Sequence, residues 1–202
     1  MRPVFLIGYM GCGKTTLGEA LARQMDVPFI DLDEYIEHQQ EMTIVEIFAS
    51  KGEERFRQLE TAALRQVAAM GGVIVACGGG TPCRDTNMEM MNQAGITVWL
   101  TTSPQRITAR LLLPEQRIKR PKFKALPDDA FLPLVQRELA IRAPHYRQAQ
   151  LQFDSTDIET AAATTRTARR LATLLESPNT PLHLNTNNQQ PTTNNQELKT
   201  NN

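Results

Sequence analysis

Short apolar runs alternate with longer amphipathic stretches through the first 177 residues of the chain. Several of the apolar runs end at glycine or aspartate, as buried strands of a parallel sheet often do. The runs predict strands at residues 4–7, 28–31, 73–77, 97–100 and 151–154. Between them, apolar residues recur with the period of one helix face. The amphipathic stretches predict helices at residues 14–25, 33–40, 43–50, 53–70, 86–93, 104–112, 128–146 and 157–176.

Strands that alternate with helices predict an α/β fold, in which helices cover both faces of a parallel sheet. In such sheets, ligands bind beyond the carboxyl ends of the strands. The residues that directly follow each predicted strand are therefore the first candidates for chemistry.

The last 25 residues, 178–202, differ from the rest in composition, because 16 of them are Asn, Thr or Gln and three are Pro. Such a segment has too little apolar surface to offset its ordering entropy. We therefore expect one folded domain over residues 1–177, followed by a disordered tail without a catalytic role. A partner-binding role for the polar tract is the weaker alternative.

Charge and cysteine content exclude several classes of protein. The chain has 22 basic and 22 acidic residues, which gives no general reason to expect binding to nucleic acid or to an acidic membrane. Three cysteines without a CxxC pair argue against a disulfide scaffold and a structural zinc site, and they suit a reducing cytoplasm. No run of 18 apolar residues occurs, so we expect no membrane span.

A glycine-rich segment, GYMGCGKT at residues 8–15, follows the first predicted strand and opens the first helix. It matches the phosphate-binding pattern G-x-x-x-x-G-K-[ST] in full. Its glycines allow the backbone to point N–H groups at a phosphate, and the helix adds the positive end of its dipole. Lys14 can reach the β- and γ-phosphates, and the Thr15 hydroxyl can bind Mg²⁺. The segment predicts a nucleoside triphosphate site, without specifying a kinase, an ATPase or a switch.

Two carboxylates, Asp31 and Asp33, follow the second predicted strand. Two residues apart on an extended segment, they would point the same way, beside the phosphate loop. One can bind Mg²⁺ through water, and the other can accept a hydrogen bond or a proton from a substrate hydroxyl. The structural alternative is that Asp33 caps the following helix.

Three further segments carry candidate binding groups. Glycines 78–80 follow the third strand, where they allow a ligand to approach the backbone closely. Arg57 lies on the long helix, and Arg142 lies near the end of the helix at 128–146. The alternatives are a plain turn for the glycines, a solvated side chain for Arg57 and simple pairing with the helix dipole for Arg142.

Residues 113–127 are strongly basic and flanked by prolines. They resemble a mobile lid that would place a cation on a transferring phosphoryl group and exclude water. A solvated loop is one alternative. A nucleic-acid patch is a weaker one, because the segment has little aromatic interleaving and the chain has no second basic surface.

Taken together, these segments resemble the shikimate kinase family over about residues 3–176. The resemblance rests on GYMGCGKTT, DLD, GEERFRQLE, VIVACGGG, the lid KRP and RAPHY, in the family's order and spacing. It implies a three-layer P-loop fold of the nucleoside-monophosphate-kinase type, with a five-stranded parallel sheet of order 2-3-1-4-5 and a mobile lid. It also implies phosphorylation of the 3-hydroxyl of shikimate by ATP, in aromatic amino-acid synthesis, by a monomer.

The resemblance also implies roles for individual residues. Asp33, Arg57, Gly79 and Arg142 would bind shikimate. Lys14, Asp33 and Arg120 of the lid would be catalytic, with Arg120 on ATP and the transferred phosphoryl. Thr15 would bind Mg²⁺ directly, and Asp31 would hold it through water. The remaining contacts to ATP phosphates would come from Gly11, Cys12, Gly13, Lys14, Thr15 and Thr16.

The chemistry of the substrate agrees with these residues, since two arginines suit a carboxylate and Asp33 suits a hydroxyl. Whether Asp33 removes the proton or only orients the hydroxyl stays open. The lid departs from the family, because RPKF replaces RP followed by two apolar residues, and Cys77 replaces a small or hydroxyl residue. A gluconate-kinase-like enzyme is the nearest rival, and a nucleotide-dependent switch is a more distant one, since the chain has no N/TKxD segment.

Overall fold

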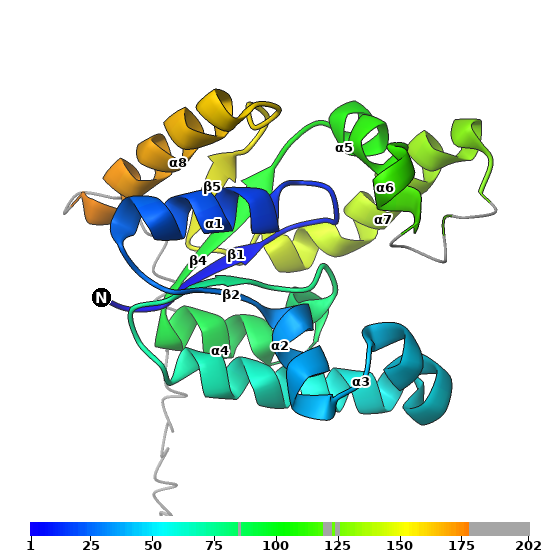
Figure 1. The fold of residues 1–202 in the computed structure, drawn as a ribbon, viewed down its shortest axis with the longest axis horizontal. Helices are drawn as coiled ribbons and strands as arrows, with labels where there is room; N and C mark the ends of the chain where they lie inside the picture. The colour runs from blue at the N-terminus through cyan, green and yellow to red at the C-terminus, as the bar shows by residue number, and fades with distance from the viewer. Residues whose placement is uncertain (85, 119–122, 124–125, 178–202) are drawn as a thin grey trace, which may run out of the picture.

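The computed structural model describes residues 1–84, 86–118, 123 and 126–177. Its centre is one sheet of five parallel strands in the order β2-β3-β1-β4-β5 (Figure 1). The strands are β1 (Val4–Ile7), β2 (Phe29–Asp31), β3 (Ile74–Ala76), β4 (Ile96–Thr101) and β5 (Leu151–Asp154). The α/β fold and the strand order 2-3-1-4-5 are thereby confirmed.

Helices lie on both sides of the sheet, as Figure 1 shows. They are α1 (Lys14–Met25), α2 (Leu32–Gln40), α3 (Ile44–Ala68), the 3-10 turn η1 (Thr81–Cys83), α4 (Asn87–Ala94), α5 (Pro104–Leu111), α6 (Pro114–Ile118), α7 (Asp128–Tyr146) and α8 (Ala161–Glu176). The predicted bounds of β1, α1, α7 and β5 agree with the structure to the residue. No helix in the described part of the chain is long and apolar enough to cross a membrane.

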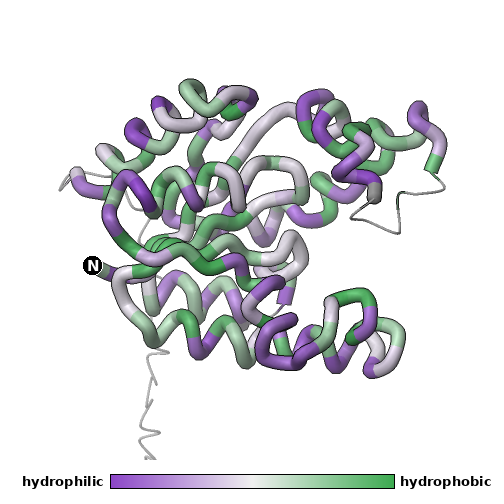
Figure 2. Tube along the Cα trace, viewed as in Figure 1, coloured by the Kyte–Doolittle hydropathy of each residue, from purple (hydrophilic) through white to green (hydrophobic). Residues whose placement is uncertain are grey.

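The apolar core lies in two layers, one on each face of the sheet. In β1, Val4 and Leu6 face one layer and Phe5 and Ile7 face the other, because successive residues of a strand point to opposite sides. Helices α1 and α8 cover the first face, and α2, α3, α4, α5 and α7 supply the second. Figure 2 shows the same arrangement: the central strands are mostly hydrophobic, and the surrounding helices carry both hydrophobic and hydrophilic residues.

Helix α3 combines the two helices predicted at 43–50 and 53–70. Its backbone breaks at Gly52, where φ is 77° and ψ is 169°, so the two parts are joined across a kink. A capping box begins the helix: the Thr43 side chain accepts a hydrogen bond from the Glu46 backbone N–H at 3.2 Å, and the Glu46 carboxylate accepts one from the Thr43 N–H at 2.7 Å. Glu53, Glu54 and Arg57, which follow the kink, line the cavity described below.

Helix α8 begins at Ala161, four residues later than predicted. The Thr160 side chain caps it by accepting a hydrogen bond from the Ala163 N–H at 3.2 Å. The preceding residues have other partners, since Ile158 packs in the core layer of α1 and Glu159 pairs with Arg110. The prediction was wrong here because tertiary contacts of 157–159 outweighed helical periodicity.

The predicted lid, residues 113–127, is only partly within the described residues, which leave out 119–122 and 124–125. Its first part forms α6. Arg117 pairs with Asp128 at 2.7 Å, donates to the Leu126 carbonyl and lies 5.0 Å from the centroid of the Phe131 ring. Phe123, the second residue after the RP of the lid, is buried and lies 5.3 Å from the same ring, measured between centroids. The predicted tail, 178–202, lies outside the described residues.

Candidate active site

The phosphate loop between β1 and α1 has the backbone that its glycines predict. Gly8, Gly11 and Gly13 have φ angles of 139°, 78° and 98°. A Cβ on Gly8 would lie 2.7 Å from the Leu100 carbonyl oxygen, so this glycine has no room for a side chain. Gly13 is the N-cap of α1 and supplies no side-chain cap, which leaves the first N–H groups of the helix facing the loop.

Lys14 lies across this loop. Its Nζ donates to the Gly8 carbonyl at 2.9 Å and to the Tyr9 carbonyl at 3.2 Å. Cys12 is buried, and burial raises the pKa of its thiol, so its side chain fills space rather than serving as a nucleophile. Its carbonyl accepts a hydrogen bond from the Ser155 hydroxyl at 2.7 Å. Hydrogen bonds therefore hold the loop at two points, and the Lys14 ammonium group lies against the carbonyls of Gly8 and Tyr9. Thr16 follows in the first turn of α1 and is exposed.

Thr15 and Asp31 lie side by side, because β2 ends next to the start of α1. The Thr15 hydroxyl donates to Asp31 Oδ2 at 2.8 Å. A hydroxyl and a carboxylate are oxygen donors that suit Mg²⁺, which usually takes few protein ligands and completes its shell with water and phosphate oxygens. The described residues contain no group of three or more His, Cys, Asp or Glu that could hold a metal by themselves. The pair fits an ion that arrives with a nucleotide.

Asp31, rather than Asp33, caps helix α2. Asp31 Oδ1 accepts a hydrogen bond from the Asp33 backbone N–H at 3.1 Å. Asp33 itself lies in the first turn of the helix, so the expected extended segment carrying both carboxylates was wrong. The helical turn still leaves the two aspartates close together, and the capping role considered for Asp33 belongs to its neighbour.

The carboxyl group of Asp33 is electrostatically unusual. Burial, together with the negative charges of Asp31 and Glu60, raises the pKa of this carboxyl group to about 6, against the opposing effect of Lys14. Asp33 lies beside the first glycine after β3, since its Oδ1 would be 3.1 Å from a Cβ on Gly78. A carboxyl group with this pKa is ionised at neutral pH and can still accept a proton.

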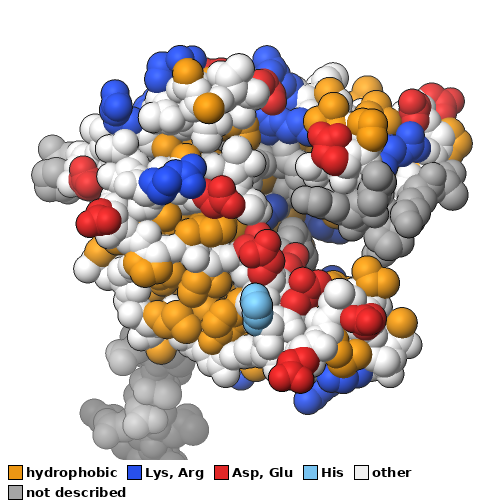
Figure 3. All heavy atoms as spheres, viewed as in Figure 1, with side chains coloured by type: hydrophobic (Ala, Val, Ile, Leu, Met, Phe, Trp, Pro, Cys, Tyr) orange, Lys and Arg blue, Asp and Glu red, His pale blue; other side chains and the backbone are white. Residues whose placement is uncertain are grey.

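Arg57 of α3 and Arg142 of α7 line one cavity of about 560 Å³. The space-filling view shows the molecule hollowed between the α3 region and the part that contains α5 and α6 (Figure 3). Charged side chains and a glycine make up most of the cavity wall. Its lining residues are Glu53, Glu54, Arg57, Gly80, Cys83, Arg84, Glu138, Ile141, Arg142 and His145.

Arg57 and Arg142 are each paired with a carboxylate, and each keeps only 22% of its side chain exposed. Arg57 contacts Glu60 at 2.9 Å and Glu53 at 3.2 Å. Arg142 contacts Glu138 at 2.7 Å. These pairs hold both guanidinium groups in place along the cavity, so Arg57 is not the freely solvated side chain considered from sequence.

The glycine turn after β3 separates the two arginines. A Cβ on Gly80 would lie 2.8 Å from Arg57 Nη1, and one on Gly79 would lie 3.4 Å from Arg142 Nη1. The Gly79 carbonyl accepts a hydrogen bond from the Tyr146 hydroxyl at 2.6 Å. The same Cβ on Gly79 would lie 3.6 Å from the Met10 backbone nitrogen, so the turn lies beside the phosphate loop. The arginine cavity and the phosphate loop are therefore neighbours.

Two residues of this region were missed from sequence. Glu60 is a buried glutamate on the apolar face of α3, in series with Phe56, Ala63 and Leu64, and this interruption of an apolar stripe was the available signal. Arg110 of α5 donates to the Gly11 carbonyl at 2.9 Å and also pairs with Glu159. Its contact with the loop joins residues 99 apart in sequence, which no local pattern reveals. Arg120 lies outside the described residues.

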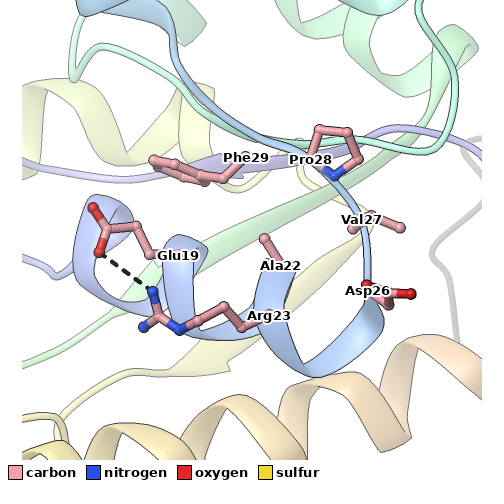
Figure 4. A pocket seen from close by; sticks show the side chains of 7 residues that line it. All are labelled: Glu19, Ala22, Arg23, Asp26, Val27, Pro28 and Phe29. Carbon is pink, nitrogen blue, oxygen red and sulfur yellow. Dashed lines mark ion pairs between the residues drawn. The ribbon is translucent and has the colours of Figure 1, made fainter.

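A second hollow of about 470 Å³ lies away from this site, at the end of α1 and the start of β2. Figure 4 shows its side chains, among them the Glu19–Arg23 pair at 3.9 Å, around an open surface. The hollow adjoins Phe29, the first residue of β2, whereas the candidate site begins at Asp31, the last. It is at the amino end of the strand, where α/β sheets do not usually bind their ligands.

Comparison with known proteins gives one consistent family. Residues 10–172 match the family described as Shikimate kinase. A shikimate kinase of Bacteroides thetaiotaomicron is 43% identical over 176 residues, covering 87% of this chain and 99% of the relative. The crystal structure of shikimate kinase from that organism aligns with a TM-score of 0.83 over the same shares of the two chains. The structure of shikimate kinase from Acinetobacter baumannii in complex with shikimate aligns with a TM-score of 0.73 at 30% identity, covering 87% of this chain and 93% of that one.

Proposed function

Because this chain belongs to the shikimate kinase family, and is therefore an enzyme that phosphorylates shikimate with ATP, we propose that its phosphate loop and its arginine cavity hold the two substrates. The phosphoryl group would pass from ATP to the 3-hydroxyl of shikimate at the boundary between them. The closeness of Gly79 to the phosphate loop is the observation that supports this arrangement most directly, because it brings the two sites within reach of one transferring group.

ATP would bind at the phosphate loop. Backbone N–H groups from Gly11 to Thr16 would bind the phosphates of ATP, and Lys14 would move from the loop carbonyls to the β- and γ-phosphates. Thr15 would bind Mg²⁺ directly and Asp31 through water, and the ion would neutralise charge on the triphosphate. Arg120, which lies outside the described residues, would contact ATP and the transferred phosphoryl.

Shikimate would bind in the arginine cavity. The guanidinium groups of Arg57 and Arg142 would bind the carboxylate of shikimate, because a planar fork pairs well with a carboxylate. Gly79 would let the substrate approach the backbone between them. Catalysis would then depend mainly on positioning and on neutralising charge, as is usual in phosphoryl transfer.

Asp33 would act on the 3-hydroxyl. Its pKa, although raised to about 6, still leaves it ionised at neutral pH, and it lies next to both Gly78 and Asp31. We propose that Asp33 accepts the hydrogen bond of the hydroxyl and takes up its proton as the phosphoryl bond forms.

The proposal also covers features that the sequence led us to expect. The folded domain at residues 1–177 would work as a monomer in the cytoplasm, without nucleic acid or membrane. Size-exclusion chromatography with light scattering tests the monomer directly: a single species near 22.7 kDa is expected, and a stable dimer would contradict it.

The acceptor is tested by measuring ADP release from ATP and Mg²⁺ with different acceptors. Shikimate should stimulate ADP release strongly, whereas gluconate and nucleoside monophosphates should not. Chelation of the metal should stop the reaction, and added Mg²⁺ should restore it. Stimulation by gluconate alone would favour a gluconate-kinase-like enzyme, and no stimulation by any acceptor would refute the proposed function.

A further inference from the structure

The hydroxyl of Thr81 forms a buried hydrogen bond next to the arginine cavity. Thr81 Oγ1 donates to Glu60 Oε1 at 2.5 Å. Thr81 is fully buried, and Glu60 is 1% exposed. A hydrogen bond to a charged group is worth more than one between neutral groups, and it gains further strength where water is excluded. The Thr81 hydroxyl therefore fixes one oxygen of the Glu60 carboxylate.

The other oxygen of the same carboxylate holds Arg57. Glu60 Oε2 accepts a hydrogen bond from Arg57 Nη1 at 2.9 Å. The second partner of this arginine, Glu53, has a side chain that is 70% exposed, so its contact at 3.2 Å orders the guanidinium only weakly. The buried chain from Thr81 through Glu60 is thus the firmer of the two supports for Arg57.

Thr81 is itself held by the backbone and by a neighbouring amide. Its N–H donates to the Gly78 carbonyl at 3.1 Å, and its carbonyl accepts a hydrogen bond from Asn87 Nδ2 at 2.9 Å. Asn87 is fully buried and accepts a further hydrogen bond from the Thr61 hydroxyl at 3.1 Å. Thr81 therefore has a fixed position relative to both α3 and α4.

The space around Gly78 shows how tightly these groups converge. A Cβ at Gly78 would lie 2.8 Å from Glu60 Oε1, 3.0 Å from Thr81 Oγ1 and 3.1 Å from Asp33 Oδ1. The Glu60–Thr81 contact thus adjoins the carboxyl group of Asp33 that is proposed to meet the acceptor hydroxyl.

We propose that Thr81 is a positioning residue for the acceptor: its hydroxyl fixes Glu60, and Glu60 fixes the guanidinium of Arg57 toward the carboxylate of the substrate. Thr81 does not touch the substrate in this arrangement. The inference rests on the proposed function and deepens it, because it names the group that orders one half of the carboxylate site.

Substitution of Thr81 by valine removes the hydroxyl and keeps the shape of the side chain. Loss of this charge-assisted hydrogen bond should raise the KM for shikimate about tenfold, with kcat and the KM for ATP changed by less than about twofold. Thr81→Ser should restore the KM, and Thr81→Ala repeats the test with a smaller side chain. The matched control is Thr167→Val on α8, which removes a buried hydroxyl that donates to the Asp157 carbonyl at 2.7 Å, away from the cavity.

A substrate without the negative charge separates positioning from general damage. The methyl ester of shikimate offers Arg57 no carboxylate, so Thr81→Val should change its kcat/KM much less than that of shikimate. Equal losses for both substrates, or no change for shikimate, would overturn the inference and leave the proposed function standing. Calorimetric titration of shikimate gives an independent readout: wild type should bind more tightly than Thr81→Val, and no binding to wild type would refute the proposed function together with the inference.

Discussion

The phosphate loop and the arginine cavity are neighbours that are built in opposite ways. The loop is made of backbone, with three glycines at positive φ and a lysine that bonds the loop's own carbonyls. The cavity is made of side chains from α3, α7 and the turn after β3, and carboxylates hold Arg57 and Arg142. One site is local in sequence, whereas the other is assembled from residues far apart.

This difference has consequences for how each site responds to change. The shape of a backbone site depends on particular glycines, so most side-chain substitutions leave it unchanged. Its positive charge depends on one lysine, so substitution of that lysine removes the charge. A side-chain site depends on partners such as Glu60 and Glu138, so its geometry can be altered without touching a residue that meets the substrate. We therefore expect substitutions in the loop to lower kcat strongly. Substitutions in the cavity should instead raise the KM for shikimate by different amounts and leave the KM for ATP nearly unchanged.

The largest effect should come from Lys14→Ala. Loss of the cation that reaches the γ-phosphoryl should lower kcat by about a thousandfold or more. The fold should persist, because Lys14 bonds only to carbonyls of its own loop among the contacts that the structure describes. Initial rates and a thermal melt check both points, with Lys51→Ala as control, an exposed lysine that bonds Gln40. Near-normal turnover would remove Lys14 from the transfer step.

Arg142→Ala should act on one substrate only. Removal of a charge-assisted contact should raise the KM for shikimate by about 10- to 100-fold and leave the KM for ATP nearly unchanged. Arg137→Ala is the matched control, since Arg137 lies on the same helix with 69% of its side chain exposed. Steady-state kinetics in both substrates give the result, and equal changes in the two KM values would place Arg142 outside the acceptor site.

The pH dependence should reveal Asp33. Because its pKa is raised to about 6, kcat/KM for shikimate should fall about tenfold per pH unit below pH 6, as the carboxyl group becomes protonated. A profile measured from pH 5 to pH 8 tests this, and a flat profile down to pH 5 would contradict the role given to Asp33.

The raised pKa of Asp33 also predicts that this residue lowers the stability of the folded protein at neutral pH. A carboxyl group whose pKa is higher in the folded state than its ordinary value of 3.8 favours folding when protonated, so its contribution declines as the pH rises from about 4 to about 6. Asp33→Asn should therefore stabilise the protein by about 2 kcal/mol at pH 7 and by almost nothing at pH 4, while it abolishes most turnover. Urea unfolding at the two pH values measures the difference, and a destabilised variant at pH 7 would contradict it.

The smallest effect should come from deletion of residues 178–202. The composition of this segment offers little apolar surface for packing. We expect kcat within about twofold of the full chain and a melting temperature within about 2 °C. A larger loss in either measurement would show that the tail contributes to the folded domain.

The same contrast explains what could be predicted from sequence. Apolar runs and periodicity located every strand, and they gave α1 and α7 to the residue, because these elements are specified locally. The backbone conformation of the phosphate loop could be predicted from the G-x-x-x-x-G-K-[ST] pattern, because this pattern has a known physical reason. Local patterns failed where distant partners decide, as at the start of α8, where Ile158 and Glu159 contact other elements.

The acceptor site was predictable only in part. Asp33, Gly79 and the two arginines were candidates, but sequence could not show that Arg57 depends on a buried glutamate and a threonine from the turn after β3. The separation of 21 residues between Thr81 and Glu60 hides that contact from any pattern of helix or strand. The family resemblance named the substrate, and the structure shows which groups order the side chains that are proposed to bind it.

The most direct test of the account is to identify the product. Purified protein would be incubated with ATP, Mg²⁺ and shikimate, and the phosphorylated position would be assigned by phosphorus–proton coupling in NMR spectra. The account predicts a single product, with the phosphoryl group on the 3-hydroxyl. Phosphorylation at another hydroxyl, or ADP formed without a phosphorylated product, would contradict the proposed placement of shikimate between the arginine cavity and the phosphate loop.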